Sequence, residues 1–162
     1  MQGTTEIERK FLIRSLPDLS LLPKIEYERY FLFISESIEM RIQKKGNVYE
    51  FERKEVRDNL SRIGNTIQIS PDEFAALKKS TIGEIIRESY TYANNPDISI
   101  KIYHGKFEGL QRVEVEFKTI EEAKDFQPMP WFGREITDTK LAQDKKLLQL
   151  EEGEFGSLLK EI

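Results

Sequence analysis

Apolar and polar residues alternate with a period of two over the first two-thirds of the chain, which is the pattern of β-strands. This alternation predicts eight strands, over residues 5–13, 27–35, 37–44, 48–56, 61–70, 84–93, 98–104 and 110–118. Gly46-Asn47 and the run from Asn94 to Asp97 separate successive strands and predict hairpin turns. The predicted sheet has enough strands to close on itself.

Helical signals are fewer and lie mostly in the last third of the chain. Ser70 followed by Pro71 has the form of an N-cap with proline at the first helical position. Thr119 and Glu122 have the spacing of a capping box. We therefore expect helices over 71–79, from 119 to about 125, over 138–150 and over 154–161. The fold class is a β-rich α+β protein.

The length and composition predict one cytoplasmic domain. The chain has 162 residues and 33% charged residues, with no linker-like segment, so we expect a single domain over residues 1–162. No apolar run approaches the roughly 20 residues that cross a bilayer, and the first ten residues are charged rather than apolar. We therefore expect no membrane partner and a cytoplasmic location.

Residue types that are absent or rare exclude several chemistries. The chain has no cysteine, so disulfides, thiol catalysis and thiolate metal sites are excluded. The single histidine, His104, has no nucleophile-elbow pattern to accompany it. A net charge of −4 gives little electrostatic support for general nucleic-acid binding.

Charged residues recur at every second position of several predicted strands, so they share one face of each strand. Glu6, Glu8 and Lys10 share such a face, as do Glu114 and Glu116. The plainest interpretation is a solvated outer surface with cross-strand ion pairs. Like charges about 6.6–6.8 Å apart on one face are costly, however, unless water or a cation separates them. Their recurrence on several strands therefore favours a site for a divalent cation.

The residue types also suit a phosphorylated ligand. Mg²⁺ is commonly held by one or two carboxylates together with water and substrate phosphates. Arginine and lysine bind phosphate oxygens, and arginine does so in a bidentate manner. The acidic candidates are Glu6, Glu8, Glu114 and Glu116, and the basic candidates on aligned faces are Lys10, Arg41, Lys54 and Arg62.

The run Glu6-Ile7-Glu8-Arg9-Lys10 resembles the ExExK signature of the CYTH domain, also called the triphosphate tunnel metalloenzyme family. Other segments resemble later strands of that family, in the family's order. They are Ser-Ile-Glu-Met-Arg-Ile at 37–42, Glu-Arg-Lys at 52–54, Ser-Arg at 61–62, Val-Glu-Val-Glu-Phe at 113–117 and Pro-Trp-Phe-Gly-Arg-Glu-Ile-Thr at 130–137.

This resemblance implies a closed eight-stranded antiparallel β-barrel with a charged interior. It also implies Mg²⁺- or Mn²⁺-dependent chemistry on triphosphates, by inorganic, thiamine or RNA triphosphatases or class IV adenylate cyclases; short bacterial members mostly resemble inorganic triphosphatases. Matched by position, Glu6, Glu8 and Lys10 would be catalytic. The metal ligands would be Glu6, Glu8, Glu114 and Glu116, and the substrate-binding residues Lys10, Arg41, Lys54 and Arg62. We expect all eight side chains to point into one lumen.

Several positions depart from the family pattern. Glu88 and Tyr90 stand where the family has lysine and arginine, and Lys101 stands where it has an acid. The other replaced positions are Gln43, Gly64, Thr66 and the segment Ala142-Gln143-Asp144. Two functions therefore stay open, a weakened metal-dependent triphosphatase and a catalytically impaired barrel that binds a polyanion; a cyclase is less favoured. The expected partner is a small triphosphate, and association into homodimers stays open.

Overall fold

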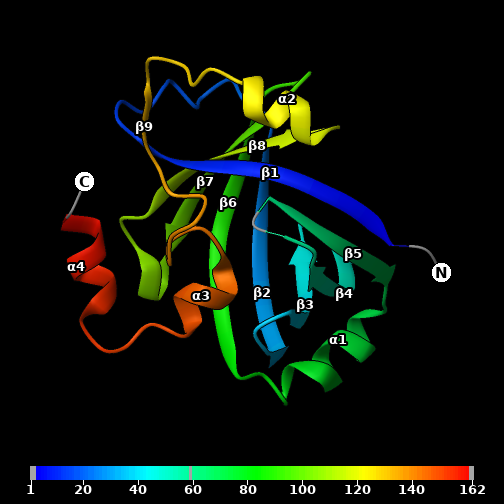
Figure 1. The fold of residues 1–162 in the computed structure, drawn as a ribbon. Helices are drawn as coiled ribbons and strands as arrows, with labels where there is room; N and C mark the ends of the chain where they lie inside the picture. The colour runs from blue at the N-terminus through cyan, green and yellow to red at the C-terminus, as the bar shows by residue number, and fades with distance from the viewer. Residues whose placement is uncertain (1–2, 59, 161–162) are drawn as a thin grey trace.

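The computed structural model describes residues 3–58 and 60–160 and shows a closed antiparallel β-barrel (Figure 1). Eight strands form the barrel, and their order around it is β5-β4-β3-β2-β6-β7-β8-β1, with β1 also pairing to β5. The predicted strands are confirmed to within a few residues at their ends. They are β1 (Thr4–Ile13), β2 (Lys24–Ile34), β3 (Ile38–Lys45), β4 (Val48–Val56), β5 (Ser61–Gln68), β6 (Gly83–Ala93), β7 (Asp97–His104) and β8 (Gln111–Phe117).

Strand β1 closes the barrel because both of its edges are paired. One edge pairs with β8, where Glu8 lies opposite Glu116, and the first half of the other edge pairs with β5. Beyond β5, a ninth strand, β9 (Phe132–Glu135), covers the rest of that edge. The sequence did not predict β9, because a segment of four residues carries too little alternation to be read as a strand. Its pairing protects an edge that would otherwise be exposed.

The strands carry their apolar side chains outside the barrel and many of their charged side chains inside it. Ile7 and Phe11 of β1 pack on the outside in a cluster with Val113 and Val115 of β8. Helix α2 (Ile120–Asp125) covers this cluster, and α1 (Pro71–Lys78) covers a second one with its buried Phe74. The helices supply the apolar cover that frees the interior for polar groups.

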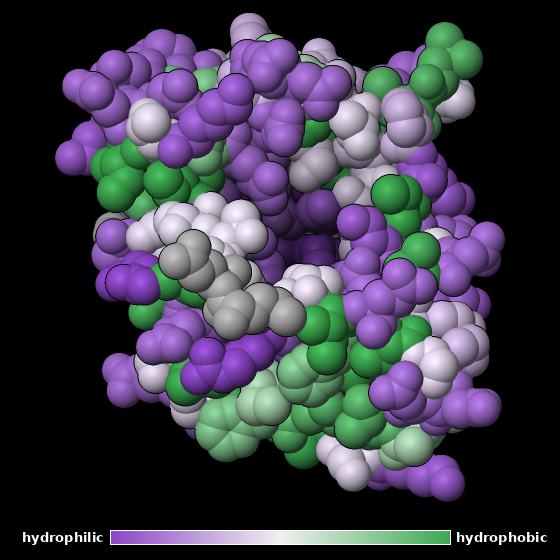
Figure 2. All heavy atoms as spheres, turned by 90° about the vertical axis from the view of Figure 1, so that its right-hand side faces the viewer, coloured by the Kyte–Doolittle hydropathy of each residue, from purple (hydrophilic) through white to green (hydrophobic). Residues whose placement is uncertain are grey.

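An apolar plug fills one end of the barrel. Leu12, Phe31 and Ile85 continue the inward-facing rows of β1, β2 and β6, and they are buried together with Leu141 and Leu147 of the C-terminal segment. Helices α3 (Asp144–Leu148) and α4 (Glu154–Lys160) lie at this end (Figure 1). The face of the molecule on the right of Figure 1 has a hollow lined by hydrophilic residues (Figure 2).

The helix expected over residues 138–150 is wrong in extent, because α3 covers only Asp144–Leu148. In the preceding turns, the carbonyl oxygens of Leu141 and Ala142 accept hydrogen bonds from Arg112 and Lys10 of the barrel. Oxygens used in this way do not accept from a helical ladder, so the barrel interior limits the helix.

The remaining helices agree with the predictions. Helix α1 has the predicted Ser70 cap, whose hydroxyl accepts from the backbone N–H of Glu73, and Thr119 caps α2 in the same way. Residue 161, the expected end of the last helix, lies outside the described residues. A 3₁₀ turn, η1 (Gly105–Phe107), follows β7. In the described part of the chain, none of the helices has the length and apolar character needed to span a bilayer.

Candidate active site in the barrel interior

The eight predicted site residues all line one cavity inside the barrel, which we call the barrel cavity. It has a volume of about 290 Å³ and is bounded almost wholly by charged and amide side chains. The predicted residues that line it are Glu6, Glu8, Lys10, Arg41, Lys54, Arg62, Glu114 and Glu116. The structure thus brings together side chains that are more than 100 positions apart in the sequence.

The acidic wall of the cavity is formed by the neighbouring strands β1 and β8. Glu8 lies opposite Glu116 in the register of the two strands, and Lys10 lies opposite Glu114. Glu116 takes part in none of the ion pairs formed by the described residues. Glu116 is an exposed residue, but partial burial of its carboxylate raises its pKa, and the nearby carboxylates of Glu8 and Glu114 raise it further. The wall therefore has a surplus of negative charge around Glu116, which a cation would relieve.

The other carboxylates of this wall are occupied by cations of the protein itself. Lys54 Nζ lies 2.7 Å from Glu6 Oε1, and Arg62 Nη2 lies 3.0 Å from Glu8 Oε1. Glu114 is shared among three cations, of which Arg112 is nearest at 3.1 Å. Over residues 3–58 and 60–160, no three acidic or histidine side chains are grouped so that they could hold a metal ion. A metal would have to take these carboxylates from their present partners.

The basic wall is held in place by Glu39 and Glu52, which were not among the predicted site residues. Glu39 accepts from Arg62 at 2.7 Å and from Arg41 at 2.8 Å, while Arg41 also contacts Glu52 at 3.2 Å. Arg41 is thus fixed by carboxylates of its own strand β3 and of the neighbouring β4, and Arg62 is fixed by Glu39 across the barrel interior. Such a fixed arrangement presents the guanidinium groups to the cavity with little freedom to turn away.

At the plugged end, one carboxylate binds three arginines that the sequence prediction missed. Asp144 of α3 lies 2.9 Å from Arg29, 3.3 Å from Arg112 and 3.5 Å from Arg87, and it accepts a hydrogen bond from Tyr103. Its side chain is 2% exposed. The Nε–H groups of Arg87 and Arg112 are buried without an acceptor. This end of the cavity is therefore rich in donors that an anion could use.

The expectation that Glu88 and Tyr90 face the phosphate-binding wall is wrong. Glu88 forms an ion pair with Lys24, contacts the His104 ring and accepts a hydrogen bond from the Tyr90 hydroxyl, on the outer side of the barrel. Arg87 lines the cavity instead. The two adjacent residues Ile85 and Ile86 break the alternation on this strand, so the pattern does not indicate which face is inside.

Most of the remaining departures from the family pattern lie at the cavity, although Gly64 and Ala142 are not among the residues that line it. Gln43 accepts from Arg29 at 2.9 Å and donates to Glu50 at 2.7 Å, and Thr66 lines the wall. Lys101 lines it as well. These replacements are themselves polar or charged, so the lining of the cavity stays hydrophilic.

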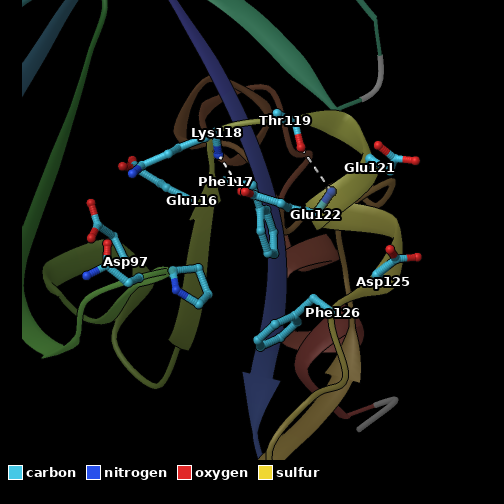
Figure 3. A pocket seen from close by; sticks show the side chains of 11 residues that line it. Asp97, Glu116, Phe117, Lys118, Thr119, Glu121, Glu122, Asp125 and Phe126 are labelled. Atoms are coloured by element: carbon cyan, nitrogen blue, oxygen red, sulfur yellow. Dashed lines mark hydrogen bonds between the residues drawn. The ribbon is translucent and has the colours of Figure 1, made fainter.

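A second hollow, of about 810 Å³, lies outside the barrel and shares Glu116 with the barrel cavity. Figure 3 shows its residues, which come from β8, α2 and the turn before β7. Five of the lining side chains are acidic and one, Lys118, is basic. An acidic hollow of this kind repels phosphate groups, so the barrel cavity is the better phosphate site although it is smaller.

The ion pairs of the cavity predict acid lability. Burial by itself would raise the pKa of Glu52, but Arg41, Arg29 and Lys54 outweigh it and lower the pKa to about 2. A group whose pKa is lowered by folding stabilises the protein above its unfolded pKa, and that stability is lost as the pH falls to the folded pKa. We therefore expect Tm to fall between about pH 4.5 and pH 2, and to fall less steeply in Glu52→Gln. Equal slopes of Tm against pH in the two proteins would contradict this.

Comparisons with known proteins agree with the geometry. No family model matches the sequence, so the name of the domain still rests on the motifs. The inorganic triphosphatase of Nitrosomonas europaea is 34% identical over 146 residues, which cover 88% of this chain and 96% of that protein. The crystal structure of an inorganic triphosphatase matches with a TM-score of 0.68 at 31% identity, covering 91% of this chain and 100% of that one.

A more distant structure shares the fold alone. A protein from Pyrococcus horikoshii matches with a TM-score of 0.59 at 17% identity, covering 92% of this chain and 93% of that one. The closed antiparallel barrel confirms the fold that the resemblance implied. Because the identity of 34% extends over nearly the whole of both sequences, the chain belongs to the inorganic triphosphatase family, which is a family of hydrolases.

Proposed function

We propose that this protein hydrolyses a triphosphate, either inorganic tripolyphosphate or a small organic triphosphate, with the help of Mg²⁺ or Mn²⁺. The observation that carries the proposal is one cavity lined by the carboxylates of Glu6, Glu8, Glu114 and Glu116 on β1 and β8 and by the cations of Arg41, Lys54 and Arg62 on β3, β4 and β5. A metal-bound triphosphate has cationic and anionic sides that match these two sets of side chains. The relationship to an inorganic triphosphatase supports the same conclusion.

The carboxylates present fit a hard divalent cation. Glu8, Glu114 and Glu116 lie on paired strands, and the raised pKa of Glu116 follows from burial and from the carboxylates around it. These three residues, with Glu6, would hold the ion. When bound, the ion would neutralise charge on the phosphate oxygens and on the transition state.

Binding of the substrate would exchange partners within the cavity. The carboxylates now paired with Lys54 and Arg62 would turn to the cation, and the freed ammonium and guanidinium groups would bind phosphate oxygens. Lys10 and Arg41 would complete the set of phosphate ligands. The present ion pairs thus keep the charged side chains in position until the substrate replaces them.

In the reaction, a carboxylate of Glu6 or Glu8 would orient the attacking water and accept its proton, while Lys10 stabilises charge on the phosphoryl group. Lys10 Nζ lies 3.2 Å from Glu8 Oε1 and donates to the carbonyl oxygen of Ala142 at 2.6 Å. These contacts hold its ammonium group beside the carboxylate.

The test is release of orthophosphate from tripolyphosphate. We expect release with Mg²⁺ or Mn²⁺ and none with excess chelator. Calorimetric binding of tripolyphosphate without release would instead support the polyanion-binding alternative, and formation of cyclic AMP from ATP would support a cyclase. One argument for the impaired barrel is weaker than the sequence suggested, because Glu88 and Tyr90 lie outside the cavity. The cytoplasmic location, the single domain and the oligomeric state stay predictions.

A further inference from the structure

Lys101 of β7 is a buried cation with no opposite charge next to it. It lines the barrel cavity and is 8% exposed. The other buried lysines and arginines that line the cavity each have a carboxylate within 4 Å, whereas none of the ion pairs among the described residues includes Lys101. Its ammonium group donates to the hydroxyl of Ser89 at 2.7 Å. Burying an ammonium group without an opposite charge is costly, so this arrangement calls for an anionic ligand.

The groups around Lys101 add to this demand. Arg87 of β6, Arg29 of β2 and Arg112 of β8 face it and repel its charge, while Glu114 of β8 attracts it from beyond ion-pair distance. The centre of the Tyr27 ring of β2 lies 5.6 Å from Lys101 Nζ. Tyr103 lies two residues after Lys101 on β7. Three guanidinium groups and one ammonium group therefore meet on this side of the cavity.

The register of β6 and β7 explains how the ammonium group comes to lie there. Ser89 follows Arg87 on the inward face of β6, and it lies directly opposite Lys101 on β7. The serine side chain is short, which leaves room for the lysine side chain of the neighbouring strand. Lys101 thus supplies a cation at a position where β6 has only a hydroxyl.

We propose that Lys101 is a further phosphate-binding residue of this protein, contacting the triphosphate from the β7 side of the cavity. The inference rests on the proposed function for the identity of the anion. Lys101 would add a phosphate contact from β7, a strand that belongs to neither the acidic nor the basic wall. Lys101 would then help to set the affinity for the triphosphate.

A proton should accompany this contact. Burial lowers the pKa of Lys101 to about 7, with the neighbouring arginines contributing and Glu114 opposing. Near pH 8 much of the free protein would have a neutral amine at this position. A bound phosphate group favours the charged form, so binding should raise the pKa and take up a proton.

Calorimetric titration with tripolyphosphate tests the proposal. Lys101→Met should weaken binding by about 10–100-fold at pH 7, the value of a hydrogen bond between charged groups. Lys101→Arg should retain most of the affinity, because its guanidinium group stays charged. The wild type should take up a proton at pH 8, measured in buffers of different ionisation enthalpy, and both variants should take up less.

Two further variants separate a role in binding from a role in structure. Lys106→Met removes an exposed lysine from η1 and should leave the affinity unchanged. The double variant Ser89→Arg with Lys101→Ser moves the cation to β6 and should restore binding without the proton uptake. Because Lys101 has no carboxylate partner, Lys101→Met should not lower Tm.

The outcomes distinguish this proposal from the proposed function. If the wild type releases orthophosphate while Lys101→Met binds tripolyphosphate as tightly as the wild type does, the role of Lys101 is overturned and the function stands. If the wild type binds tripolyphosphate without releasing orthophosphate, and Lys101→Met loses that binding, the hydrolase proposal fails and the role of Lys101 stands. Failure of the wild type to bind either tripolyphosphate or ATP would overturn both.

Discussion

Replacing Asp144 by alanine is expected to lower the free energy of unfolding by about 3–5 kcal/mol, the usual cost of removing one partner from a buried ion pair. Asp144 is the carboxylate shared by Arg29, Arg87 and Arg112 at the plugged end of the barrel. Without it, Arg87 and Arg112 keep Glu114 as their one carboxylate partner among the described residues, and Arg29 keeps a hydrogen bond to the neutral Gln43. Chemical denaturation at pH 7 measures the loss.

Asp138→Ala is the matched control, because Asp138 is exposed in the turn before α3, and we expect it to change stability by no more than about 0.5 kcal/mol. A second measurement tests the electrostatic cause. Tripolyphosphate supplies negative charge to the freed arginines, so it should raise Tm more in Asp144→Ala than in the wild type. Equal stability of Asp144→Ala and Asp138→Ala would show that the three arginines do not depend on this carboxylate.

Replacing Glu116 by glutamine is expected to weaken Mn²⁺ binding by at least about 10-fold, by analogy with the loss seen when residues that support metal ligands are changed. We expect orthophosphate release to fall with it. Glu116 belongs to none of the ion pairs found in the described ranges, so the substitution breaks no such contact. Because its pKa is raised by burial and by Glu8 and Glu114, neutralising it should leave Tm unchanged or raise it.

Two carboxylates serve for comparison, with calorimetric Mn²⁺ titration and Tm measured on each variant. Glu121→Gln removes an exposed acidic residue from α2 and should leave Mn²⁺ binding unchanged. Glu114→Gln should weaken Mn²⁺ binding and also lower Tm, because Glu114 is the counter-charge of Lys10, Arg87 and Arg112. Unchanged Mn²⁺ affinity in Glu116→Gln would move the metal to another position.

The barrel could be predicted because its strands obey one simple rule. On β1, Ile7 and Phe11 alternate with Glu6, Glu8 and Lys10, so the pattern predicts the strand and its two faces, while only the resemblance to the family predicted that the charged face lies inside. The same rule holds on β8. Alternation of apolar and charged residues is local in the sequence, so an analysis of periodicity predicts the strands that carry it.

The contacts that depend on distant segments could not be predicted. Asp144 meets Arg29 and Arg87 only after the chain has closed, and nothing near residue 144 in the sequence signals three guanidinium groups. The wrong face on β6 has a different cause, since Ile85 and Ile86 carry no alternation and only pairing with β2 and β7 decides which of them points inward.

The apolar plug at one end of the barrel also bears on how a reaction in the cavity would finish. Leu12, Phe31 and Ile85 fill that end together with the C-terminal segment. Hydrolysis would leave one product next to the plug and the other nearer the hydrophilic hollow. The inner product can leave only through the space that the outer product occupies. The two products would therefore depart in a fixed order, and the outer one, added in excess, would compete with fresh substrate and hold the inner one in place.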